Sequence, residues 1–157
     1  MKTLIIGLGN PILGDDGVGW CVAEEVAQKM ANRPEVEVDT ASLGGLSLME
    51  RLTGYERVIL IDAIFTGTKP VGTVSQFTLS DIQGLTAGHS ASAHDTSLRN
   101  ALNVGRGMNM PLPEDNDVMI VAIEAENVYD FTEELSPAVA AAVPQAVKVV
   151  LELLLLA

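Results

Sequence analysis

The fold is decided by residues 2–19, which read KTLIIGLGNPILGDDGVG. A short apolar run ends at Gly7, and a glycine-rich polar stretch then leads into a second apolar segment. This order is typical of a strand, a tight loop and a helix. We expect the helix to take Asp15 or Asp16 as its N-cap and to end before Pro34.

Strands and helices alternate along the rest of the chain. The hydrophobic pattern predicts further strands at 36–38, 57–61, 71–79 and 118–123, and helices around 46–52, at 95–104 and from Ser136-Pro137 onward. Strands separated by helices imply βαβ units, and no repeat, linker or charge run divides residues 1–157. We therefore expect a single α/β domain with an open, mostly parallel sheet and helices on both faces.

Charge and composition restrict the partners. The 157 residues contain 9 Lys plus Arg against 21 Asp plus Glu, a net charge of −12, which argues against nucleic acid and anionic membranes. The apolar stretch 137–157 carries Lys148 and Glu152, so we expect a core helix rather than a membrane span. The lone Cys21 and the absence of a leader-like start favour a cytoplasmic protein, which we expect to be a monomer.

Chemistry-bearing side chains follow three of the predicted strands. In open α/β sheets the functional crevice lies beyond the carboxyl ends of the strands, so the loops after the first, third and fourth strands should face one another. These loops bring Asp16, Asp62 and His94, a carboxylate and imidazole set that suits a divalent metal with an open position. The plainer alternatives are that Asp16 caps a helix, Asp62 bonds loop amides and His94 is solvated.

A dinucleotide site is a competing interpretation of the glycine-rich loop. Gly7 and Gly9 match the first two glycines of that fingerprint, but Ile12 stands at the third glycine position and Gly14 comes two residues late. The two aspartates that follow would also repel a pyrophosphate at the helix N-terminus. The spacing and the electrostatics therefore disfavour a dinucleotide.

Four motifs give the chain a resemblance to the hydrogenase maturation proteases: GLGNPILGDDGVG, RVILIDA, SAHD and the closing ELSPAVAAAVPQAV. The resemblance spans nearly the whole chain in order. It implies a three-layer α/β/α domain with a twisted sheet. It also implies an endopeptidase that removes a C-terminal extension from the precursor of a nickel-iron hydrogenase large subunit after nickel insertion.

The resemblance also assigns roles to residues. A carboxylate of the first loop, an Asp after the central strand and a His of the later loop bind the metal, and these fall on Asp16, Asp62 and His94. Nickel arrives on the precursor, and zinc or cadmium could take the same ligands. Catalysis by metal polarisation and catalysis by carboxylates alone both remain open. The alternative function is a noncatalytic metal-responsive or nucleotide-binding α/β module.

Overall fold

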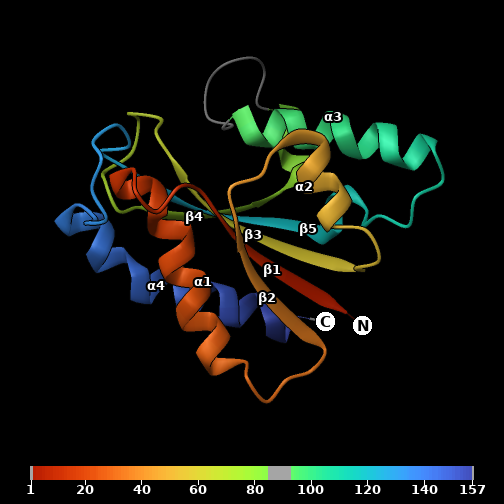
Figure 1. Cartoon of the computed structure of the whole chain (residues 1–157), viewed down its shortest axis with the longest axis horizontal. Helices are drawn as coiled ribbons and strands as arrows, with labels where there is room; N and C mark the ends of the chain where they lie inside the picture. The colour runs from red at the N-terminus through yellow and green to blue at the C-terminus, as the bar shows by residue number, and fades with distance from the viewer. Residues whose placement is uncertain (1, 85–92, 157) are drawn as a thin grey trace.

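The protein has three layers, with helices on both faces of a five-stranded sheet (Figure 1). The computed structural model describes residues 2–84 and 93–156. Within these ranges, the side chains of residues 82–84 and 93–97 are not described. The elements are β1 (Thr3–Leu8), η1 (Gly14–Gly17), α1 (Val18–Lys29), β2 (Val36–Ala41), α2 (Gly45–Arg51), β3 (Arg57–Ile64), β4 (Val74–Thr78), η2 (Leu79–Gly84), α3 (Ala93–Gly107), η3 (Asp115–Asp117), β5 (Val118–Glu124) and α4 (Pro137–Leu155).

The sheet has the strand order β2-β1-β3-β5-β4. β1 pairs in parallel with β2 and with β3, and β3 pairs in parallel with β5. Only β4, at one edge of the described sheet, runs antiparallel to its neighbour β5. The expectation of an α/β fold with a mostly parallel sheet and helices on both faces is confirmed.

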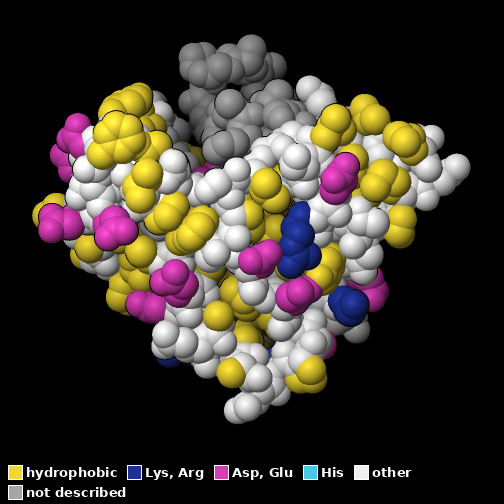
Figure 2. All heavy atoms as spheres, in the orientation of Figure 1, with side chains coloured by type: hydrophobic (Ala, Val, Ile, Leu, Met, Phe, Trp, Pro, Cys, Tyr) yellow, Lys and Arg dark blue, Asp and Glu magenta, His cyan; other side chains and the backbone are white. Residues whose placement is uncertain are grey.

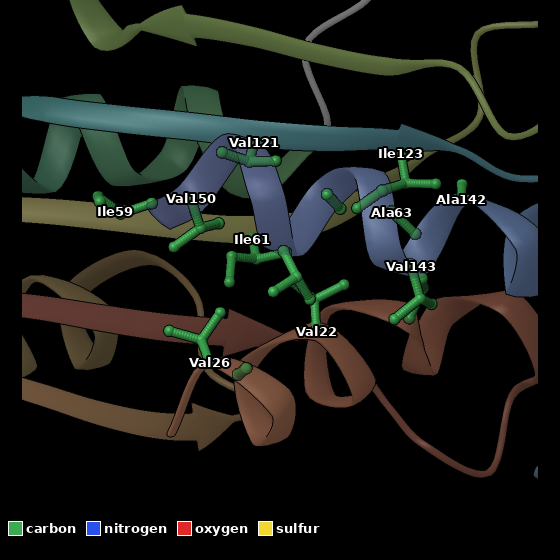
Figure 3. Close-up of a cluster of buried hydrophobic side chains, with 14 of the residues drawn as sticks. Val22, Val26, Ile59, Ile61, Ala63, Val121, Ile123, Ala142, Val143 and Val150 are labelled. Atoms are coloured by element: carbon green, nitrogen blue, oxygen red, sulfur yellow. The ribbon is translucent and has the colours of Figure 1, made fainter. Parts of the chain in front are cut away.

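Two apolar clusters hold the layers together. One cluster lies between the sheet and the helices α1 and α4, where Val22, Val26, Ile61 and Val143 meet (Figure 3). The other lies between the opposite face and the helices α2 and α3, and it includes Leu60. Each cluster uses alternate residues of the strands, because successive side chains in a strand point to opposite faces.

α4 is long and apolar enough to cross a membrane by length and composition alone. The core helices of water-soluble proteins meet the same test. Val139, Val143, Val147 and Val150 are buried against the sheet and α1, and the helix starts with Ser136 as N-cap and Pro137 in the first turn. In this structure α4 therefore packs as a core helix, and its predicted start is confirmed.

Two local expectations were wrong. α1 begins after Gly17, and neither Asp15 nor Asp16 caps it, because both lie within the 3-10 turn η1 that precedes the helix. β3 continues through Asp62 to Ile64, so Asp62 lies inside the strand. The end of β3 was misplaced because the polar residue Asp62 interrupts the apolar run in the sequence without breaking the backbone hydrogen bonds of the strand.

The expected position of the loop after β4 was also wrong. Because β4 is antiparallel, Thr78 pairs with Met119 and β4 ends at the sheet edge where β5 begins. The connection between Ile64 and Val74 contains no helix, and a parallel return needs a crossover of a dozen or more residues, usually helical.

Candidate functional site

The site is built on a close approach between α1 and the ends of two parallel strands. A Cβ placed on Gly19 would lie 2.5 Å from the carbonyl oxygens of Leu8 and Ile61. A Cβ placed on Gly7 would lie 2.2 Å from the Gly19 oxygen. Two glycines at this crossing let the start of α1 rest directly on the backbone of β1 and β3, which places η1 at the carboxyl edge of the sheet.

Asp16 lies in η1, at the end of the glycine-rich loop. Its Oδ2 accepts a hydrogen bond of 2.8 Å from the backbone N–H of Asn10, and its own N–H donates to the Leu13 oxygen at 3.1 Å. The residue is half-buried. The loop therefore holds the Asp16 carboxylate in one orientation while part of the residue faces solvent, as a ligand or a general base requires.

Asp62 is a buried carboxylate in the neighbouring strand, and it is 1% exposed. It pairs with Ala122 of β5, close to the carboxyl ends of both strands. Alternation along β3 puts its side chain on the same face as Leu60 and Ile64, which is the face covered by α2 and α3. A buried carboxylate at this edge points to a specific role, because taking a charged group out of water costs free energy.

His94 is the second residue of α3. α3 runs opposite to the parallel strands (Figure 1), so its first turn lies toward the edge that carries Asp62. The His94 side chain lies outside the described residues, as does His89. Among the side chains that are described, no group of three His, Cys, Asp or Glu converges as a metal centre. The structure thus brings Asp16 and Asp62 to one edge, and the contribution of His94 stays a prediction.

Asp15 has a structural role that sequence reasoning did not separate from that of Asp16. It is fully buried, and its carboxylate accepts hydrogen bonds from the backbone N–H groups of Glu126 (3.0 Å), Asn127 (2.9 Å) and Ser136 (2.7 Å) and from the Ser136 hydroxyl (2.8 Å). Burial raises the pKa of Asp15, but these hydrogen bonds outweigh it and hold the pKa below its ordinary value. Asp15 therefore fastens the segment before α4 to the glycine-rich loop.

Glu124 is a third buried carboxylate, and sequence reasoning missed it. It is 1% exposed at the end of β5, and it accepts hydrogen bonds from the backbone N–H groups of Thr66 (2.8 Å) and Gly67 (3.2 Å) and from the Thr66 hydroxyl (2.6 Å). The sequence offered one indication of this role: Glu124 follows an apolar run, as Asp62 does. Glu124 anchors the turn after β3 and so supports the same edge of the sheet.

The donors at this edge suit acid–base or metal chemistry better than thiol chemistry. Carboxylate oxygens on neighbouring strands can hold a divalent ion or activate a water molecule. Cys21 is half-buried, and burial together with the nearby carboxylates of Glu24 and Glu25 raises the pKa of its thiol. A raised pKa disfavours the thiolate, so Cys21 is a poor nucleophile.

The acid that a dinucleotide site would need is also engaged elsewhere. Asp39 lies within β2, and its carboxylate forms an ion pair of 3.2 Å with Arg51.

The fold and these carboxylates define an α/β protein whose site lies beyond the carboxyl ends of its parallel strands. A family model described as hydrogenase maturation protease (HycI) matches residues 21–153. The chain belongs to the hydrogenase maturation protease family, whose members are hydrolases that act as endopeptidases. The family resemblance in the sequence motifs is thereby confirmed.

Individual relatives agree with the family match. The hydrogenase expression/formation protein HupD of Rhodobacter capsulatus is 24% identical over 93% of this chain and 68% of its own length. The solved structure of the NiFe hydrogenase maturation protease HybD from Thermococcus kodakarensis has a TM-score of 0.77 and 27% identity, covering 98% of this chain and 99% of that one. The hydrogenase maturating endopeptidase HybD from Escherichia coli shares the fold, with a TM-score of 0.77, 24% identity and coverage of 98% and 92%.

Proposed function

We propose that this chain, as a cytoplasmic monomer, is the endopeptidase that removes the C-terminal extension of a nickel-iron hydrogenase large-subunit precursor after nickel insertion. In this proposal Asp16, Asp62 and His94 recognise the nickel that the precursor carries. The observation that carries the proposal is the placement of Asp16 and Asp62 at one edge of the sheet in a chain of the hydrogenase maturation protease family. The lone cysteine fits a reducing compartment.

The proposed mechanism separates recognition from hydrolysis. Oxygen and nitrogen ligands from this chain complete the coordination of an ion that the precursor already holds, which orients the scissile peptide bond at the site. A water molecule then attacks the scissile carbonyl carbon, Asp16 or Asp62 accepts its proton, and the departing amine takes a proton as the C–N bond breaks. Polarisation of the carbonyl by the metal and catalysis by the carboxylates alone both use these residues.

Intact mass spectrometry tests the proposal directly. The purified chain is incubated with nickel-loaded and with nickel-free precursor from the same source. We expect the C-terminal extension to be lost only from the nickel-loaded precursor, because the ion is what orients the peptide bond. If neither precursor changes in mass, the chain is not this endopeptidase, and tight binding without cleavage would indicate the noncatalytic alternative. Titration of the isolated chain with zinc or cadmium reports whether the same ligands hold other ions.

Substitution of the three site residues supplies the second test. We expect Asp16→Asn, Asp62→Asn and His94→Gln each to slow processing of nickel-loaded precursor about 100-fold or more, since each removes a ligand or a base. Asp117→Asn, at the opposite sheet edge, and His89→Gln are the matched controls and should process at the wild-type rate. Circular dichroism confirms that each variant is folded. A folded Asp16→Asn variant with wild-type activity would contradict the proposed site.

A further inference from the structure

Exposed apolar side chains gather beside the candidate site. Ile12 (48% exposed), Phe65 (56%), Tyr129 (74%) and Phe131 (85%) lie on the three loops that follow β1, β3 and β5, and we call them the aromatic face. Figure 2 shows hydrophobic side chains at the upper left, over the end of the molecule where Figure 1 shows the start of α1 and the loop before α4. Contiguous exposed apolar side chains usually mark a binding surface.

The aromatic face is built on cross-linked loops. The N–H of Thr132 donates to the Ile12 oxygen at 2.9 Å, and Gly14 donates to the Thr132 oxygen at 2.8 Å. The rings of Phe65 and Tyr129 meet edge to face with centroids 6.3 Å apart. The buried Asp15 carboxylate also binds the segment before α4, through the backbone N–H groups of Asn127 and Ser136. A surface held in this way presents its side chains without a large ordering cost on binding.

A small pocket adjoins the aromatic face. It measures about 140 Å³ and is lined by Pro11, Gly17, Trp20, Cys21, Glu24, Glu133 and Leu135. Pro11 precedes Ile12, Glu133 follows Thr132, and the backbones of Ile12 and Thr132 are hydrogen-bonded, so the pocket adjoins the face. Its lining combines apolar walls and an indole with two exposed carboxylates. That combination fits the aliphatic stem and the cationic head of a Lys or Arg side chain.

The charge around the aromatic face is predominantly negative. Glu126, Asp130, Glu133 and Glu134 are exposed on the loop before α4. Lys69, whose ammonium donates to the Ser75 hydroxyl at 2.9 Å, is the one Lys or Arg of the three loops. The sequence has no other Lys or Arg at 3–28, 58–73 or 107–147. A second copy of the chain would bring like charges together, and a phosphate backbone would be repelled. The surface therefore selects a partner that is apolar and basic.

We propose that the aromatic face and its pocket bind a segment of the precursor that carries apolar side chains next to a Lys or Arg. This inference rests on the proposed function, because it names the surface that engages the substrate beside the cleaved bond. The apolar side chains pack on Tyr129 and Phe131, and the cation enters the pocket between Glu24 and Glu133. Aromatic anchors at a preformed surface are the side chains that dominate binding energy at interfaces.

Initial rates of processing at varied concentrations of nickel-loaded precursor test this inference. We expect Tyr129→Ser/Phe131→Ser to raise KM about tenfold or more while kcat stays near the wild-type value, because the contacts lie outside the reacting centre. Glu24→Gln/Glu133→Gln should raise KM similarly. We expect the KM of the wild-type protein to rise with NaCl, because salt screens the ion pairs, and this rise should be absent in the Glu24→Gln/Glu133→Gln variant. All four side chains are exposed, so both variants should unfold at the wild-type temperature.

Two matched controls isolate the surface. Val104→Ser/Met108→Ser removes exposed apolar side chains from the end of α3, and Glu50→Gln/Glu56→Gln removes exposed carboxylates near α2. Both controls should keep the wild-type KM. If the two test variants also keep it, the docking surface is wrong although cleavage by the wild-type protein upholds the proposed function. If the wild-type protein leaves nickel-loaded precursor intact, the proposed function itself fails.

Discussion

Asp15 and Asp16 are adjacent in the glycine-rich loop but have different roles. Asp15 points inward and binds four donors that belong to the segment before α4. Asp16 stays half-buried at the sheet edge, where one backbone N–H orients it. The difference arises because successive residues of a tight turn point in different directions. One residue thus builds the edge and the next is available for chemistry there.

Removal of the Asp15 charge should destabilise the fold. We expect Asp15→Asn to lower the free energy of unfolding by about 2 to 3 kcal/mol at neutral pH, because a neutral amide offers one acceptor oxygen to donors that now share a buried carboxylate. Urea denaturation measures the loss. Asp117→Asn, at an exposed carboxylate, should change it by less than about 0.5 kcal/mol. Equal stability of Asp15→Asn and the wild-type protein would refute the anchoring role.

The pKa of Asp15 predicts a pH dependence of the same quantity. Hydrogen bonds hold this pKa below the ordinary value of 3.8, so the folded state favours the ionised carboxylate. The stability that it contributes is complete above pH 3.8 and is lost as the pH falls through the lower folded value. We therefore expect the difference between wild-type and Asp15→Asn proteins to shrink below about pH 4. Urea titrations at several pH values follow it, and a constant difference would contradict the assignment.

At the scale of elements, the contact between α1 and the sheet positions the candidate site. α1 crosses the ends of β1 and β3 at a distance that only glycine permits at position 19. The helix uses Val22 and Val26 to pack on the sheet, while its first turn follows η1 directly. Any displacement of α1 would therefore move η1, and with it the Asp16 carboxylate, away from β3.

Gly19→Ala should disrupt this contact. The added methyl group would overlap backbone oxygens of Leu8 and Ile61, which cannot move without breaking the strand ladder. We expect a loss of about 2 kcal/mol or more in unfolding free energy, together with slower precursor processing. Gly107→Ala is the matched control, because a Cβ at Gly107 meets nothing within 4 Å. Thermal denaturation compares the two, and an unaffected Gly19→Ala variant would show that the close approach is unimportant.

At the scale of the whole molecule, two separate cores make the sheet rigid while its carboxyl edge stays accessible. α1 and α4 cover one face, α2 and α3 cover the other, and the parallel direction of β1, β3 and β5 brings their carboxyl ends together. Buried Asp15 and Glu124 then fasten the loops at that edge. The molecule thus presents a candidate site on a scaffold whose parts hold one another in place.

The role of α4 as a core helix is testable with two leucines of its last turn. Leu153 is 5% exposed and Leu155 is 78% exposed. We expect Leu153→Ala to cost about 2 kcal/mol of unfolding free energy, since it leaves a cavity in the cluster shared with the sheet and α1. Leu155→Ala should cost less than about 0.5 kcal/mol. Similar values for the two variants in urea denaturation would mean that α4 is not packed as described.

Local sequence patterns predicted the fold class and most of the elements. Strands such as β3 and β5 were predictable because their buried residues form continuous apolar runs, and the start of α4 was predictable from Ser136-Pro137. These signals are local, since they depend on hydrophobic period and on capping chemistry. The motifs also placed the chain in its family, which the family model confirms.

Three features could not be predicted from local pattern: the direction of β4, the separate roles of Asp15 and Asp16, and the structural role of Glu124. Each depends on partners distant in sequence: β5 for the strand, Ser136 for Asp15 and Thr66 for Glu124. Local pattern carries no information about which donors will meet a carboxylate after folding. Whether a charged residue anchors a loop or faces the site is therefore set by packing, which brings those partners within hydrogen-bond distance.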